Sequence, residues 1–157
     1  RNDLALLNAA CDLHEVGLLL EFKQHQQHGA YILQHADLPG FNQAERQLLV
    51  ALVLLYKGEI DLTPLQKQTA TSVEQASYLL VILRLAVILC RRRKDDALPD
   101  YQTTIVKSRG DDIINLCLPT LWLAQHPLIA DELLQENSHL AQVNLSLNIY
   151  CETQIER

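Results

Sequence analysis

The first ninety or so residues have the hydrophobic pattern of a helical domain. Apolar side chains recur three and four positions apart, too densely for one amphipathic stripe, and helix-stop signals interrupt them. We expect a helix over 4–15 that ends at Gly17, and a second that begins near His28 and ends before the loop at 37–41. The pattern predicts an all-helical domain over 1–97.

Helix-capping signatures divide the rest of this segment. Asn42 is followed three residues later by Glu45, which is typical of an N-cap and opens a third helix. Thr71 and Glu74 repeat the signature before a long helix that we expect to reach about Arg92. Between them, a Thr-Pro pair predicts a short helix over 65–68.

After about residue 97 the hydrophobic period changes from helical to two, which indicates a second, smaller unit over 98–157. Its expected elements, in order, are a strand over 101–107, a turn, a strand over 113–118, helices over 119–123 and 127–140, and a strand over 143–150. The chain is therefore predicted to be mostly α, a helical bundle followed by a strand-strand-helix-helix-strand subdomain.

Composition narrows the class of protein. The 157 residues are 48% hydrophobic and carry a net charge of −6, so they can bury a core and produce no overall basic field that would attract nucleic acid. The apolar run at 79–89 is too short for a membrane span and is broken by Arg84.

The four cysteines form no CxxC pair and are expected to be reduced thiols of a cytoplasmic protein. The chain has no methionine and starts inside a helical pattern, so we expect a fragment of a longer protein.

The candidate chemistry lies near the end of the first helix. His14 and Glu15 are adjacent there, and His25, His28 and His35 follow shortly after. Imidazole and carboxylate groups gathered in this way can bind a divalent metal. Histidines of helical proteins are more often packed or solvent-facing side chains, so spacing alone does not decide between the two roles.

The order Leu13-His14-Glu15-Val16-Gly17, followed by a run from His28 into an apolar helix, resembles the HD-domain superfamily of metal-dependent phosphohydrolases. The resemblance implies that Glu15 replaces the Asp of the His-Asp pair and that His28 is kept. Tyr56-Lys57 stands where further histidines would be, and Arg84 stands where a late Asp would be. Because a guanidinium offers no lone pair to a metal, we regard His14, Glu15, His28 and Arg84 as a vestigial metal site that holds no metal.

Arg84 is expected to take over the charge of the lost metal. A buried guanidinium is stabilised by a carboxylate, so we expect an ion pair with Glu15 or Asp12.

A more specific resemblance is to the C-terminal region of the exopolyphosphatase/guanosine pentaphosphate phosphohydrolase family, an HD-like helical domain followed by a small α+β part. The segments that carry it are, in order, Ala9-Ala10, Leu13 to Leu18, His28, Ala30 to Gln34, Asp37 to Gln43 and Leu83 to Leu89. The resemblance implies a parent enzyme that removes terminal phosphate from polyphosphate or guanosine pentaphosphate. That chemistry would use magnesium in two N-terminal actin-like domains, which are missing here.

The glycine-rich phosphate loops that such catalysis requires do not occur in this chain, which has five glycines. We therefore expect an inactive fragment. The resemblance further implies a homodimeric parent enzyme in which this region guides polyphosphate. The candidate polyphosphate-binding residues are Arg91, Arg92, Arg93 and Lys94. Cations at a helix C-terminus also simply complement the helix dipole. Two other functions stay open, a stand-alone HD-type phosphohydrolase and a purely structural helical module.

Overall fold

The computed structural model describes residues 2–19, 24–90 and 101–150. Contacts within the chain divide it into two units, Arg1–Val87 and Ile88–Arg157. The expected boundary near residue 97 falls in 91–100, outside the described residues. The predicted fold class is confirmed, because a series of helices is followed by a small unit that contains a three-stranded sheet.

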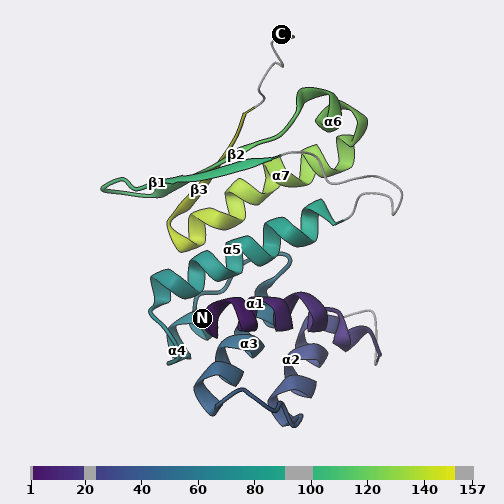
Figure 1. Ribbon diagram of the computed structural model, residues 1–157, viewed down its shortest axis with the longest axis vertical. Helices are drawn as coiled ribbons and strands as arrows, with labels where there is room; N and C mark the ends of the chain where they lie inside the picture. The colour runs from purple at the N-terminus through teal and green to yellow at the C-terminus, as the bar shows by residue number, and fades with distance from the viewer. Residues whose placement is uncertain (1, 20–23, 91–100, 151–157) are drawn as a thin grey trace. The chain divides into compact units, whose positions relative to one another are not determined.

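The described residues of the first unit are mostly helical (Figure 1). In chain order the helices are α1 (Asn2–Leu13), the 3-10 helix η1 (Val16–Leu19), α2 (His25–His35), α3 (Gln43–Leu55), α4 (Thr63–Lys67) and α5 (Val73–Leu89). α2 packs on η1 and α3, and α3 also contacts α1 and α4. Because α3 is the shared neighbour, three of its leucines, Leu48, Leu49 and Leu52, are fully buried.

The start of α3 has the predicted capping box. The Asn42 side chain accepts a hydrogen bond from the Glu45 backbone N–H at 2.8 Å, and the Glu45 carboxylate accepts one from the Asn42 N–H at 3.5 Å. This arrangement satisfies two backbone donors that a helix otherwise leaves without partners.

The cap of α5 differs from the prediction. Ser72, and not Thr71, accepts the hydrogen bond from the Gln75 backbone N–H, at 3.1 Å. Thr71 is held one step earlier, where its N–H and carbonyl both bond to the side-chain amide of Gln68. The neighbouring hydroxyl therefore falls in register with the first turn, and α5 begins at Val73.

α5 is the most apolar helix of the described residues, and Arg84 lies within it. It has 17 residues, and no helix in the described ranges is long and apolar enough to cross a membrane. Most of its side chains are buried, including that of Arg84. The prediction of a buried core helix is confirmed.

The second unit pairs a sheet with a helix (Figure 1). β1 (Gln102–Val106) and β2 (Asp112–Cys117) form the predicted antiparallel hairpin, and β3 (Leu145–Tyr150) lies parallel to β2. Two helices, α6 (Thr120–Gln125) and α7 (Pro127–Leu140), and the 3-10 helix η2 (Ala141–Val143) connect β2 to β3, and α7 contacts β3. The alternation of buried Leu145 and Leu147 with more exposed neighbours agrees with the predicted one-sided strand.

Candidate functional site

Two glycines bring η1 against α2. A Cβ atom on Gly17 would lie 1.7 Å from the carbonyl oxygen of His25 and 2.6 Å from the backbone nitrogen of Gly29. A Cβ on Gly29 would in turn lie 3.2 Å from a methyl group of Val53 in α3. The glycine that follows His14-Glu15-Val16 is thus a packing requirement, since no other residue allows the two backbones to approach so closely.

His14 lies just beyond the last residue of α1 and is mostly buried. Its Nδ1 lies 2.6 Å from the carbonyl oxygen of Cys11, and its Nε2 lies 3.8 Å from the carboxylate of Glu15. The Glu15 side chain is 66% exposed, so this contact is a surface ion pair that forms when the imidazole is protonated. The ring of His14 also meets the ring of Tyr56 edge-on, with centroids 4.8 Å apart.

Tyr56 connects α1 and α2 to the end of α3. It is the residue directly after α3 and is 4% exposed. Its hydroxyl group is hydrogen-bonded to Nε2 of His25, in the first turn of α2, and the two rings meet edge-on. Tyr56 therefore lies between two of the histidines that the sequence analysis singled out, at the place where the HD-type pattern would have put further histidines.

Arg84 reaches the same end of α3 from α5. Its Nη1 donates a hydrogen bond to the carbonyl oxygen of Leu55 at 2.5 Å, and its Nη2 donates one to the carbonyl oxygen of Gly58 at 2.6 Å. The side chain is 2% exposed. A cation at the C-terminus of a helix satisfies carbonyl groups that have no partner within the helix and interacts favourably with the helix dipole.

The expected pairing of Arg84 with Glu15 or Asp12 is wrong. Glu15 pairs with His14 instead, and the two hydrogen bonds described above direct Arg84 to backbone carbonyl oxygens. The prediction did not consider backbone carbonyl oxygens as partners for a buried cation. The C-terminal carbonyls of a helix carry partial negative charge and serve the same purpose.

His28 lies on α2, one turn after His25, and is partly buried. Within the described ranges, no group of three or more His, Cys, Asp or Glu side chains is arranged to hold a metal ion. The structure brings together His14, His25 and Tyr56, and sequence reasoning missed this set because it took Tyr56 only as a departure from a histidine pattern. The sequence did contain a signal for this set. Tyr56 stands where the pattern would have a histidine, and its hydroxyl group can form a hydrogen bond with a nearby imidazole.

The arrangement can therefore hold protein elements together, because its imidazole, phenol and guanidinium groups bond to one another or to backbone carbonyls. The guanidinium of Arg84 supplies positive charge, and it would repel a divalent cation. The other candidate site, Arg91 to Lys94, lies outside the described residues.

Comparisons with known proteins agree on one family. The family model described as "Ppx/GppA phosphatase, domain III" matches residues 1–137. A guanosine-5'-triphosphate,3'-diphosphate pyrophosphatase of Pseudoalteromonas translucida (strain TAC 125) is 42% identical over 146 residues. This match covers 93% of the chain and 28% of the relative, so the chain spans little more than a quarter of the relative's length.

Proposed function

Because the chain belongs to the Ppx/GppA phosphatase family and corresponds to its domain III, we propose that it is a non-catalytic domain that binds polyphosphate for a larger phosphohydrolase. The observation that carries the proposal is the family match over residues 1–137. The parent enzyme would remove terminal phosphate from polyphosphate or from guanosine pentaphosphate.

The structure supports the non-catalytic part of this proposal through Arg84. In an HD-type hydrolase this position would supply a metal ligand, and here it supplies a buried cation bonded to Leu55 and Gly58. A positive charge held at that place raises the free energy of a bound divalent ion, which such hydrolysis requires. The alternative of a stand-alone HD-type phosphohydrolase loses support for this reason.

The relative extends far beyond the match, which supports the proposal that this chain is one part of a larger phosphohydrolase. We assign catalysis and magnesium binding to actin-like domains N-terminal to this chain in the same polypeptide. The whole enzyme would work in the cytoplasm as a homodimer, with this domain contributing to the dimer and to the path of the polyanion.

The proposed contact for polyphosphate is the run Arg91-Arg92-Arg93-Lys94. It is a dense cationic segment in a chain whose net charge is −6, so it gives the polyanion a local place to bind. Such binding releases counterions and weakens steeply as salt increases. Four contacts to a single-stranded polyanion predict a loss of affinity of at least tenfold when the salt concentration is raised fourfold.

Fluorescence anisotropy with labelled long-chain polyphosphate tests the proposal. The chain should bind, and a variant with all four residues of Arg91 to Lys94 changed to Gln should lose at least tenfold in affinity together with most of the salt dependence. The control variant changes three exposed cations elsewhere, Lys57, Lys107 and Arg109, to Gln and should bind nearly normally. Equal losses in the two variants would show that binding depends on overall charge and would overturn the assignment. Absence of binding to the unmodified chain would favour a purely structural module.

A further inference from the structure

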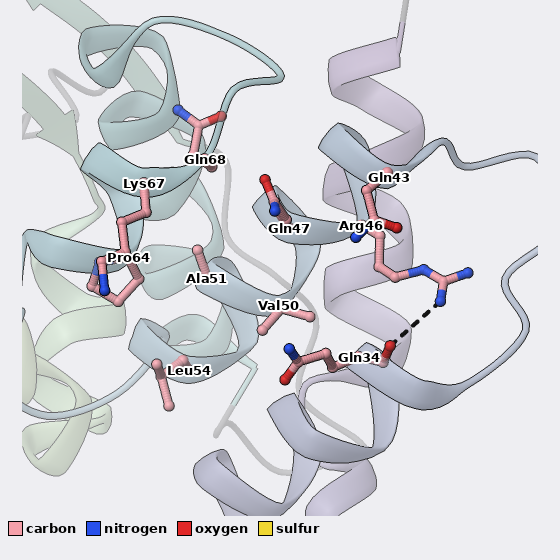
Figure 2. A pocket seen from close by; sticks show the side chains of 10 residues that line it. All are labelled: Gln34, Gln43, Arg46, Gln47, Val50, Ala51, Leu54, Pro64, Lys67 and Gln68. Atoms are coloured by element: carbon pink, nitrogen blue, oxygen red, sulfur yellow. Dashed lines mark hydrogen bonds between the residues drawn. The ribbon is translucent and has the colours of Figure 1, made fainter.

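The first unit contains a pocket whose lining includes neither His14 nor Tyr56. It has a volume of ≈ 210 Å³ and opens between α2, α3 and α4. Figure 2 shows Gln34 and Arg46 on one side, Pro64 and Lys67 on the other, and Val50 and Ala51 of α3 between them. Ligand pockets of proteins are commonly about 300–1,000 Å³, so this one would take a small ligand or one that extends into solvent.

The charged residues that line the pocket are both cationic. They are Arg46 and Lys67, and no carboxylate lines it, although acidic residues outnumber basic ones in the chain. Arg46 has donors to spare, because its Nε is buried without a hydrogen-bond partner in the described structure and its Nη1 makes only a long bond, 3.4 Å, to the carbonyl oxygen of Gln34. A buried N–H group without a partner is costly, and an anionic oxygen would satisfy it.

The neutral part of the lining suggests what the anion is attached to. The amides of Gln34, Gln43 and Gln47 are exposed to solvent, and within the described ranges they form no side-chain hydrogen bond. Gln68 differs, because its amide is fully used in bonds to Leu65, Ala70 and Thr71 and so fixes the wall of the pocket. Amides with both donors and acceptors can pair with the edge of a heterocyclic base.

The floor is apolar. Val50, Ala51 and Leu54 of α3 form it, and the ring of Pro64 flanks it. A flat ring could cover these side chains while its edge faces the glutamine amides and an attached phosphate faces Arg46 or Lys67. The pocket thus combines cations, free amides and an apolar floor, a lining that suits a phosphorylated heterocycle.

From this combination we propose that the pocket between α2, α3 and α4 binds a small phosphorylated heterocycle, of the nucleoside monophosphate class. The phosphate is held by one of the two cations on opposite sides of the pocket, Arg46 or Lys67. The edge of the base is held by the free glutamine amides, and its face by the apolar floor. The site shares no residue with Arg91 to Lys94, so it does not depend on the proposed polyphosphate contact.

Nuclear magnetic resonance of the ¹⁵N-labelled chain tests this site with adenosine and guanosine 5′-monophosphates as probes. A titration should give saturable shifts of backbone amides around Gln34, Gln47 and Lys67. Adenosine, which lacks the phosphate, and inorganic phosphate, which lacks the ring, should each bind about tenfold more weakly, as expected for loss of a charge-assisted contact or of ring burial.

Two variants and a control locate the binding. One of the two variants Arg46→Gln and Lys67→Gln, the one that removes the cation facing the phosphate, should weaken nucleotide binding about tenfold. Lys57→Gln, which changes an exposed lysine outside the pocket, should leave binding unchanged. Lys67 is exposed, so its variant is informative even if loss of the Arg46 contact disturbs folding. No saturable shift at low-millimolar nucleotide, equal binding of inorganic phosphate, or equal loss in Lys57→Gln would overturn the proposal.

Discussion

Arg84, in the middle of α5, donates a hydrogen bond to the carbonyl oxygen of Leu55, in the last turn of α3, across 29 positions of sequence. The next residue, Tyr56, bonds to His25 and packs edge-on against His14. Arg84 thus fixes the end of the helix from which Tyr56 reaches α1 and α2. Two positions of the HD-type pattern, His14 and Tyr56, are thus in ring contact, and a third, Arg84, bonds to the residue before Tyr56.

Replacing Arg84 tests how much this connection stabilises the fold. Arg84→Met keeps the aliphatic length and removes the two hydrogen bonds to carbonyl oxygens, so we expect the free energy of unfolding to fall by about 3 kcal/mol. Urea unfolding followed by circular dichroism measures it. Arg109→Met, at an exposed turn position, is the matched control and should change little. An Arg84→Met variant as stable as the control would show that the bonds contribute nothing.

The hydroxyl group of Tyr56 can be removed without removing the ring. Tyr56→Phe should lower the free energy of unfolding by about 1 kcal/mol, because His25 loses a hydrogen-bond partner and the edge-on contact with His14 remains. Tyr31→Phe provides the comparison, since Tyr31 is 64% exposed and its variant should be nearly neutral. Equal effects of the two substitutions in thermal or urea unfolding would contradict the role given to the hydroxyl.

Gly17 should tolerate no side chain. Gly17→Ala places a methyl group against the backbone of His25 and Gly29, which cannot yield as a flexible side chain would. We expect a loss of about 3 kcal/mol or more, or failure to fold. Gly110→Ala is the control, because nothing lies within 4 Å of a Cβ at that position. A Gly17→Ala variant with normal stability would mean that η1 and α2 pack less closely than described.

The pH dependence of one local contact follows from Asp61. The backbone N–H and the hydroxyl of Thr63 both bond to its carboxylate and hold the pKa of Asp61 below its ordinary value. A lowered pKa means that the folded state favours the ionised form, so the contact stabilises the start of α4 above the ordinary pKa of Asp and is lost as the pH falls through the lowered value. A titration followed by nuclear magnetic resonance should show this, with the pKa rising toward normal in Thr63→Val. A pKa of Asp61 at or above its ordinary value would contradict the contact.

The sequence predicted most elements of the fold because local signals and hydrophobic period agreed. The Asn42–Glu45 box and the alternation along β3 each specify one structure. Prediction from the sequence was less successful where two neighbouring residues could both cap a helix. Ser72 and Thr71 are both good caps, and only the use of Thr71 by Gln68 decides between them.

The site was harder to predict, since its contacts join distant segments. Tyr56 and His25 are 31 positions apart, and Arg84 bonds to backbone atoms, whose positions follow only from the fold. Spacing identified His14 and Arg84 as unusual residues, and chemistry showed that Arg84 is no metal ligand. Neither could show that the end of α3 is its partner.

The central claim, that this domain is non-catalytic and that Arg84 stands in place of a metal, is tested most directly by phosphate release from the purified chain. Polyphosphate and guanosine pentaphosphate would be supplied in turn with Mg²⁺, Mn²⁺ or Zn²⁺, and metal content would be measured after gel filtration. We predict no phosphate release above that of a His14→Ala variant and no stoichiometric metal. Release that requires a retained metal ion and is lost in His14→Ala would contradict the account.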